Sequence, residues 1–280
     1  MRKVSYYATR EALFQPETAA TVFTHDSRPS EDLLCAEISR LAYKKFERNR
    51  TASEEVVRAL SYVGYSEVEF FDKMGSEALG AYNADTSGVI VAFRGTEQDP
   101  TDLLTDVEAW RTPWTAGGNV HSGFAHALDW IWQEVGLWLR GKSGPLLFTG
   151  HSLGAALATL AASRWSPARL VTFGSPLVGD AVFARLFDSI SATRYVNCCD
   201  LVCRVPPESL GFTHVGTLRY IDQEGTIHTP ASPDFVRNDQ STAREAFILE
   251  YAWRVGTVRA RDLADHAPLN YVSPFLSDRT

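Results

Sequence analysis

Residues 145–158 read Pro-Leu-Leu-Phe-Thr-Gly-His-Ser-Leu-Gly-Ala-Ala-Leu-Ala, and this stretch decides the fold of the chain. A short apolar run leads into a Gly-X-Ser-X-Gly turn, and an alanine-rich segment that favours a helix leaves it. A strand, a tight turn and a helix in this order predict a nucleophile elbow, which holds Ser152 on a strained backbone with its hydroxyl above the sheet. Gly150 and Gly154 carry no Cβ, so the strand and the helix can approach closely. The five-residue pattern is weak alone, and its flanks make the elbow the favoured interpretation.

Length and composition describe an ordinary globular chain. Its 280 residues fit one α/β domain, and 45% of them are hydrophobic. The net charge is -7, without a basic stripe, so we do not expect nucleic-acid binding. The most apolar stretch, 153–162, is too short to span a bilayer. The first seven residues lack the apolar core of a signal peptide, so we expect a cytoplasmic protein, or a secreted one if a leader has been removed.

Four cysteines, Cys35, Cys198, Cys199 and Cys203, do not indicate a disulfide framework. Cys198 and Cys199 are neighbours on an expected strand, which would point their side chains to opposite faces of the sheet. A metal site that includes Cys203 is an alternative, but buried structural thiols are the favoured interpretation. We therefore expect neither a metal nor an organic cofactor.

Helix and strand patterns alternate around the elbow. Capping residues and apolar spacing predict helices after Ser152 and over 30–48, 53–62, 125–139, 180–190 and 241–255. Apolar and β-branched runs predict strands over 68–71, 78–82, 89–93, 146–148, 169–173 and 193–198, with hairpin turns at 83–88 and 222–225. We expect an α/β fold in a single domain over 1–280, with a mostly parallel central sheet covered by helices on both faces. Such sheets bind ligands at the carboxyl ends of their strands.

A serine hydroxyl needs a base to take its proton, and the base needs an anion to orient it. Three histidines follow Ser152 in the chain. His214 stands at the entry of a strand, which is the wrong end of a parallel sheet, and His228 belongs to an edge hairpin. His266 follows the last long helix in a loop that can fold back over the strand ends. His266 is therefore the predicted base.

Among the acidic residues, Asp200 directly follows an apolar strand, where that strand emerges at the expected site. Asp180 and Asp188 resemble surface positions of a helix, and Asp222 lies in a turn. Asp265 is the remaining alternative. Neighbours in sequence rarely orient each other's side chains well, so Asp200 is favoured.

The oxygen of an attacked carbonyl becomes negative and needs hydrogen-bond donors aimed at it. The backbone N–H of Leu153, directly after Ser152, is one expected donor. Thr96 follows another strand and could supply its N–H and its hydroxyl. A plain turn at the end of the strand is the alternative interpretation of Thr96.

These pieces together resemble the class 3 lipase family, the filamentous-fungal lipase-like α/β-hydrolases. The matching motifs keep the family order and lie at 93–96, 120–124, 150–155, 172–180, 197–207 and Asp265-His266 with Tyr271. The helical N-terminal part, 1–75, is poorly covered by the resemblance. The resemblance implies the α/β-hydrolase fold, a catalytic triad of Ser152, Asp200 and His266, and an oxyanion hole formed by Thr96 and Leu153.

The resemblance also implies roles for other residues. It implies structural rather than catalytic roles for four polar residues, namely His121, His151, Arg94 and Asp106. It places a lid segment at 97–119 over the active site. Three apolar residues of that segment would contact an acyl chain or an interface, namely Leu103, Trp110 and Trp114, although packing beneath the segment is the favoured alternative for Trp110. The fungal members are secreted and disulfide-bonded, whereas this chain shows neither a leader nor a matching cysteine set.

The expected function is that of a serine carboxylic-ester hydrolase, with a triacylglycerol lipase as the favoured kind. Its partners would be an acylglycerol or another acyl ester, and a lipid interface that it contacts transiently. A soluble esterase with an open site, of feruloyl or phospholipase A1 type, is the alternative among hydrolases, because the lid segment begins with polar residues. A non-catalytic lipase-like lipid-binding or scaffold protein is the alternative from another class.

Overall fold

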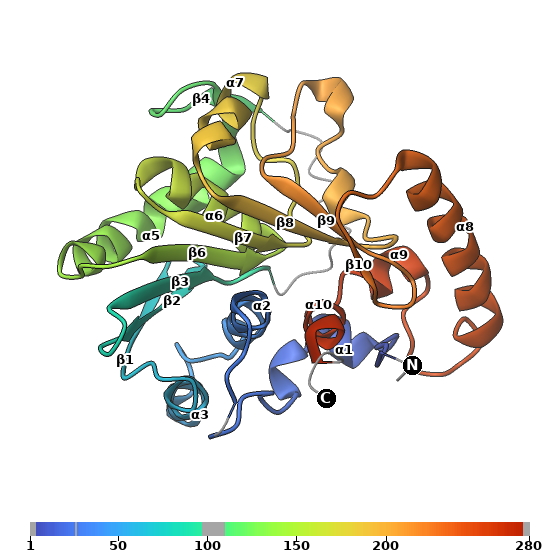
Figure 1. Cartoon of the computed structure of the whole chain (residues 1–280), viewed down its shortest axis with the longest axis horizontal. Helices are drawn as coiled ribbons and strands as arrows, with labels where there is room; N and C mark the ends of the chain where they lie inside the picture. The colour runs from blue at the N-terminus through green and yellow to red at the C-terminus, as the bar shows by residue number, and fades with distance from the viewer. Residues whose placement is uncertain (1–3, 26, 97–109, 277–280) are drawn as a thin grey trace.

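The computed structural model describes residues 4–25, 27–96 and 110–276 of the chain. Within these residues, one sheet of eight strands has the order β1-β2-β3-β6-β7-β8-β9-β10 (Figure 1). The strands are β1 (Glu67–Lys73), β2 (Ser76–Asn83), β3 (Gly88–Phe93), β6 (Leu146–His151), β7 (Arg169–Phe173), β8 (Ala192–Asn197), β9 (Thr217–Ile221) and β10 (Ile227–His228). From β3 to β9 the neighbouring strands are parallel, and β1, β2 and β10 join them antiparallel.

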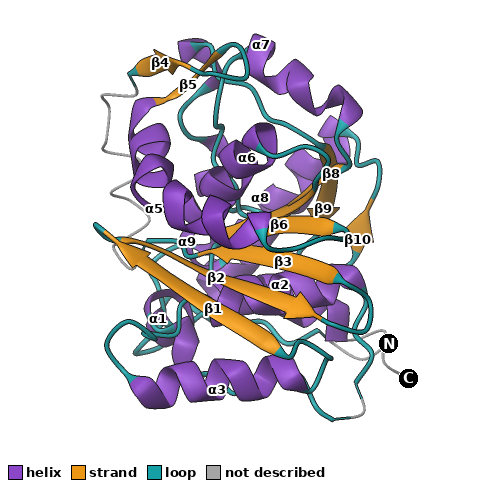
Figure 2. Cartoon of the chain, turned by 90° about the vertical axis from the view of Figure 1, so that its left-hand side faces the viewer, coloured by secondary structure: helices purple, strands orange, loops and turns teal. Residues whose placement is uncertain are grey.

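Helices cover both faces of this sheet (Figure 2). Successive side chains of a strand point to opposite faces, so Val91 of β3 enters one core and its neighbour Ile90 enters the other. The Val91 core contains residues of α5 (Ser122–Arg140) and α6 (Leu153–Arg164), and the Ile90 core contains residues of α2 (Glu31–Leu41). The predicted α/β architecture, with a mostly parallel sheet between helices, is confirmed.

The remaining described elements surround this framework. The other helices are α1 (Arg10–Phe14), α3 (Arg50–Ser61), α7 (Ala181–Ala184), α8 (Pro233–Glu250), α9 (Arg261–Ala264) and α10 (Pro268–Val272). Two short strands, β4 (Arg111–Pro113) and β5 (Asn119–His121), form a separate hairpin. In the part of the chain that the structure describes, no helix is long and apolar enough to cross a membrane.

Two predicted helices have different boundaries in the structure. Ser30 caps α2 as expected, with its Oγ accepting the Leu33 N–H at 3.3 Å, but the helix ends at Leu41 instead of reaching residue 48. The side chain of Asn49 then caps α3, which begins at Arg50. The last long helix begins at Pro233, eight residues before its predicted start, since Ser232 caps it and proline fits the first helical turn.

The neighbouring residues Cys198 and Cys199 do not lie on a strand. Strand β8 ends at Asn197, and Cys198 has a positive φ of 32°. This turn brings the Sγ atoms of Cys198 and Cys199 to 3.7 Å from each other, so the prediction that they face opposite sides of the sheet is wrong. Period-two alternation holds only while the backbone stays extended. Both thiols are fully buried.

Candidate active site

The turn between β6 and α6 holds Ser152 in a strained conformation, with φ 59° and ψ -128°. Its backbone N–H donates to the carbonyl of Phe173 at 3.0 Å, which anchors the turn to β7. A Cβ on Gly150 would lie 2.3 Å from the backbone oxygen of Gly154, and one on Gly154 would lie 2.0 Å from the backbone oxygen of Phe93. Only glycine fits either position, so this local geometry is that of a nucleophile elbow.

Three side chains from distant parts of the sequence meet at this turn. Ser152 Oγ lies 2.9 Å from His266 Nε2, and His266 Nδ1 lies 2.9 Å from Asp200 Oδ2 and 3.0 Å from Oδ1. All three are buried, and none is more than 2% exposed. Asp200 follows β8, and His266 lies between α9 and α10, so both come from segments at the carboxyl ends of the parallel strands.

The hydrogen-bond pattern fixes the proton positions along this chain. Burial alone would raise the pKa of Asp200, but the charge of His266 and the hydrogen bonds from His266 and Tyr271 outweigh burial and hold the pKa below its ordinary value. An ionised carboxylate can only accept, so Nδ1 of His266 carries the proton that it donates. In the neutral ring Nε2 is then an acceptor, and it receives the hydroxyl proton of Ser152. This is the arrangement that a general base requires.

Tyr271 and Gly174 support the acid, and neither is among the predicted catalytic residues. The Tyr271 hydroxyl donates to Asp200 Oδ2 at 2.5 Å and accepts the backbone N–H of Asn197 at 3.1 Å. Gly174 has φ +58°, and a Cβ there would lie 2.9 Å from Asp200 Oδ2 and 3.2 Å from the His266 ring. The signal for Gly174 was its place directly after strand β7, at the same edge of the sheet as Asp200.

His151, the residue before Ser152, lies beside the predicted base His266. The rings of His151 and His266 are 4.5 Å apart between centroids, and His151 Nδ1 is 2.8 Å from the Tyr43 hydroxyl. Burial and the charge of His266 lower the pKa of His151 well below its ordinary value, so His151 stays neutral. Tyr43 follows the end of α2, which ties the N-terminal part of the chain to the elbow.

The expected oxyanion donors lie at the start of α6 and the end of β3. Leu153 is the first residue of α6, where the N–H groups of a helix have no acceptor within the helix. A Cβ on Gly95 would lie 2.8 Å from the backbone oxygen of His151, so the segment that ends in Thr96 passes directly against the elbow. Leu153 therefore directly follows the nucleophile, and the segment before Thr96 packs against the elbow; their role as oxyanion donors stays a prediction.

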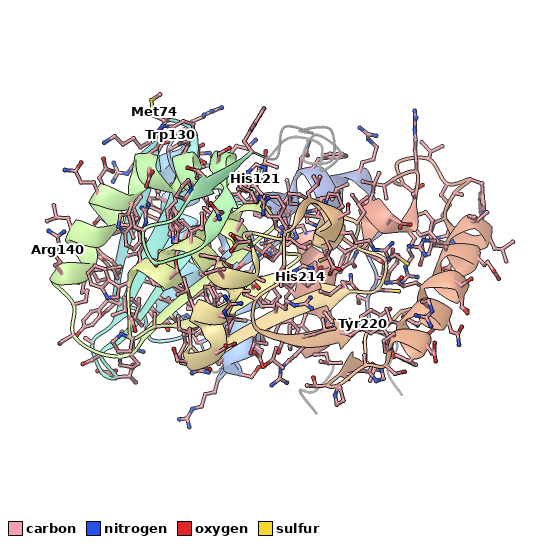
Figure 3. All side chains as sticks on the ribbon, turned by 90° about the horizontal axis from the view of Figure 1, so that it is seen from above. Met74, His121, Trp130, Arg140, His214 and Tyr220 are labelled. Carbon is pink, nitrogen blue, oxygen red and sulfur yellow. The ribbon has the colours of Figure 1, made fainter. Side chains whose placement is uncertain are left out.

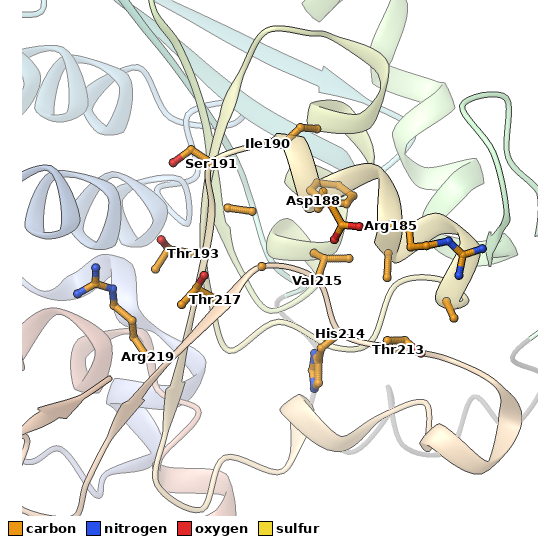
Figure 4. A pocket seen from close by; sticks show the side chains of 15 residues that line it. Arg185, Asp188, Ile190, Ser191, Thr193, Thr213, His214, Val215, Thr217 and Arg219 are labelled. Atoms are coloured by element: carbon orange, nitrogen blue, oxygen red, sulfur yellow. The ribbon is translucent and has the colours of Figure 1, made fainter. Parts of the chain in front are cut away.

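The competing histidines lie elsewhere. A groove of about 700 Å³ is lined by Thr193, His214 and Thr217 at the amino ends of β8 and β9, opposite to the ends that carry Asp200 (Figure 4). His214 Nε2 donates there to the carbonyl of Cys203 at 2.8 Å. His228 Nε2 lies 2.7 Å from a carboxylate oxygen of Asp222 in the edge hairpin.

Two of the residues for which the resemblance implies a structural role are held by contacts outside the predicted triad. His121 caps α5, with Nδ1 accepting the Phe124 N–H at 3.4 Å, and Figure 3 shows it apart from His214. Arg94 pairs with Glu47 at 3.0 Å and with Glu77 at 2.6 Å. Asp106 lies outside the described residues.

The competing acid, Asp265, points away from the ring of His266. Its carboxylate accepts the Cys199 N–H at 2.9 Å, the Tyr6 hydroxyl at 2.9 Å and the Arg261 Nε–H at 3.0 Å. One of its oxygens also lies within 4.8 Å of the thiols of Cys198 and Cys199, and these three atoms could hold a metal ion. The hydrogen bonds from Cys199, Tyr6 and Arg261 already engage this carboxylate, and Cys203 lies instead against Tyr271.

The apolar residues expected at the lid are only partly described. Leu103 and the segment 97–109 lie outside the described residues. Trp110 is 68% exposed, so the alternative that it packs beneath the segment is wrong. Trp114 is buried instead, and its Nε1 donates to Ser163 Oγ of α6 at 2.8 Å while the Arg164 guanidinium lies 4.2 Å from its ring.

Fold and elbow together define an α/β-hydrolase with a serine at its elbow. Residues 90–210 match the family model of the class 3 lipases, so the resemblance of the chain to this family is confirmed. A secreted mono- and diacylglycerol lipase of Malassezia restricta is 30% identical over an alignment of 169 positions, which covers 52% of this chain and 56% of that protein. The chain thus spans about half the length of the curated relatives it matches.

Solved structures of similar fold cover more of the chain. The lipase of Rhizopus microsporus var. chinensis superposes with a TM-score of 0.58 at 19% identity, over 95% of both chains. A Rhizomucor miehei lipase in complex with its propeptide has the same TM-score and identity, over 84% of this chain and 90% of that one. At this identity the likeness concerns the fold.

Proposed function

We propose that this chain is a serine carboxylic-ester hydrolase with Ser152 as nucleophile, His266 as base and Asp200 as the acid that orients the base. The observation that carries the proposal is the continuous hydrogen-bond chain from Ser152 Oγ through the His266 ring to Asp200. A buried carboxylate with a lowered pKa stabilises the imidazolium that forms when the histidine takes a proton. These groups suffice for acyl transfer, so the proposed mechanism uses no metal and no organic cofactor.

In the proposed reaction, His266 Nε2 takes the hydroxyl proton as Ser152 Oγ attacks the ester carbonyl. The backbone N–H of Leu153, with the N–H and hydroxyl of Thr96, stabilises the negative oxygen of the tetrahedral intermediate. His266 then protonates the departing alcohol, which leaves the acyl group on Ser152. A water molecule, deprotonated by the same ring, attacks this acyl-enzyme and releases the acid.

We propose acylglycerols as the substrate class, which makes the protein a lipase. The family match and the mono- and diacylglycerol lipase named among the relatives support this choice. Transient contact with a lipid interface is part of the proposal, and the exposed indole of Trp110, next to the segment 97–109, is suited to such contact. We also propose that residues 1–75 belong to the same domain, since Tyr43 contacts His151, and Ser39 Oγ lies 3.0 Å from Thr149 Oγ1.

The experiment for the reaction compares the wild type with Ser152→Ala on p-nitrophenyl esters of increasing chain length. We expect the substitution to lower kcat by about a million-fold, because the nucleophile is lost. A fluorophosphonate probe should label the wild type and leave the variant unlabelled. Near-normal hydrolysis by Ser152→Ala would overturn the proposal, and an unreactive wild-type serine would favour a binding protein.

The experiment for the substrate compares emulsified triacylglycerol and diacylglycerol with dissolved short-chain esters. Hydrolysis of the emulsions at rates above those on dissolved esters would support the lipase assignment. Activity on dissolved esters alone would overturn that assignment and favour a soluble esterase, while the hydrolase mechanism would stand.

A further inference from the structure

The N-terminal segment lies along the part of the chain that carries His266, and Figure 1 shows α1 beside α10. Two backbone hydrogen bonds join the N-terminal segment to residues 256–258, which precede His266 in the chain. Val258 N–H donates to the Ala8 carbonyl at 2.9 Å, and Arg10 N–H donates to the Gly256 carbonyl at 2.8 Å. The segment is therefore fixed to the chain that leads into α9.

A second connection lies after the histidine. The Tyr7 N–H donates to Asn270 Oδ1 at 2.8 Å, and Asn270 Nδ2 donates back to the Tyr7 carbonyl at 2.9 Å. The same Nδ2 donates to the carbonyl of Ala264 at 2.8 Å. Asn270 is buried, so these bonds are shielded from water. The N-terminal segment thus holds the chain on both sides of His266.

The third connection is the side chain of Tyr6. Its hydroxyl donates to Asp265 Oδ1 at 2.9 Å, and its ring lies 4.5 Å from the Arg261 guanidinium. Asp265 is fully buried and also accepts the N–H of Cys199, so it bonds to the residue directly before Asp200 and is itself directly before His266. The carboxylate of Asp265 therefore couples the position of the base to the position of its acid.

We propose that Tyr6 is a positioning residue for His266, acting through Asp265 to hold the His266–Asp200 pair in register with Ser152. This inference rests on the proposed function for its catalytic consequence. The Tyr6 hydroxyl acts on the reacting atoms through Asp265, so its loss should disturb the chemical step and leave substrate binding intact. Small displacements of a catalytic group are costly, because reacting atoms must stay within narrow limits of distance and angle.

The experiment replaces Tyr6 by Phe, which keeps the ring over Arg261 and removes only the hydroxyl. We expect kcat on a dissolved p-nitrophenyl ester to fall about tenfold, the size of effect that one lost hydrogen bond to a buried charged group allows, with KM unchanged. Hydrogen exchange, read by mass spectrometry, should rise in peptides covering 261–272 and stay unchanged in the peptides of β3 and β6. The matched control is Tyr7→Phe, because Tyr7 makes its bonds to Asn270 through the backbone and its side chain is 36% exposed.

Each outcome decides between the proposals. A drop in kcat with local exchange around His266 supports the positioning role. Unchanged kcat, or exchange that rises throughout the chain, overturns it and leaves the proposed hydrolase reaction intact. If the wild type hydrolyses no ester while Tyr6→Phe still loosens 261–272, the proposed function fails, and the attachment of His266 by the N-terminal segment stands. An equal loss of kcat in Tyr7→Phe would also overturn the role assigned to the Tyr6 hydroxyl.

Discussion

The carboxylate of Asp200 accepts more hydrogen bonds than a single buried salt bridge would supply. A buried carboxylate is costly unless its charge is compensated, and here His266, Tyr271 and the N–H of Val202 all donate to it. Tyr271 is the strongest local constraint, because its 2.5 Å hydrogen bond ends on the same oxygen that lies nearest to His266 Nδ1. The hydroxyl therefore orients the carboxylate toward the imidazole.

Substitutions at these two residues should differ greatly in effect. Asp200→Asn should lower kcat by about ten-thousand-fold, because an amide can donate to Nδ1 and stabilise the wrong tautomer of His266. Tyr271→Phe keeps the charge and removes one hydrogen bond to it, so kcat should fall only about tenfold. Steady-state kinetics on a dissolved ester checks both values. Similar losses in the two variants would contradict the view that the tautomer set by the Asp200 carboxylate matters more than the hydrogen bond from Tyr271.

At the scale of elements, the hairpin β4–β5 and helix α7 are joined by one side chain. Asp180 was expected to be a surface residue at a helix start, but it is only 9% exposed. Its Oδ1 caps α7 by accepting the N–H groups of Val182 at 3.0 Å and Phe183 at 2.9 Å, and its Oδ2 accepts the N–H and the side-chain amide of Asn119. Burial alone would raise the pKa of Asp180, but these four hydrogen bonds lower it. The helix start was predictable, and the second set of donors was not, since Asn119 is 61 residues away.

Asp180→Ala should therefore lower the free energy of unfolding by about 2 kcal/mol, because a helix cap and the side-chain hydrogen bonds to Asn119 of β5 are lost together. Urea unfolding, followed by circular dichroism, measures this difference. Asp188→Ala is the matched control, since Asp188 is exposed in the adjacent 3-10 turn, and its effect should stay within about 0.5 kcal/mol. Equal effects of the two substitutions would show that Asp180 acts only as a solvated helix cap.

At the scale of the whole molecule, local pattern predicted the sheet, the elbow and the three residues that meet there. The elbow could be predicted because strand, turn and helix follow one another within 14 residues, and Asp200 and His266 because parallel strands bring their carboxyl ends to one edge. Long-range contacts were beyond such reasoning. The burial of Trp114 depends on Ser163, the attachment of Asp265 depends on Tyr6, and the adjacent thiols depend on one positive φ at Cys198.

Buried titratable groups distributed over the molecule make its stability depend on pH. Burial lowers the pKa of His151 well below its ordinary value and, with the charge of Arg194, that of His214 to about 3. Below pH 6.5 the unfolded chain binds protons at both histidines and the folded chain does not, so their contribution to stability is lost as pH falls. Asp265 acts in the opposite direction, because burial raises its pKa to about 6 and the folded chain binds its proton first on acidification.

Between pH 6 and pH 4.5 these three groups should therefore make the unfolded state bind about one proton more than the folded state, so their joint contribution to the free energy of unfolding should fall by about 1.4 kcal/mol per pH unit. Urea unfolding at pH 8, 6.5, 5.5 and 4.5 measures this slope. His214→Gln keeps an N–H donor at the position of Nε2 for the carbonyl of Cys203 and removes one titrating group, so its slope below pH 6.5 should be smaller by about the same amount. A slope that is unchanged in His214→Gln, or stability that rises on acidification through this range, would contradict the assignment of His214 as a histidine held neutral by the fold.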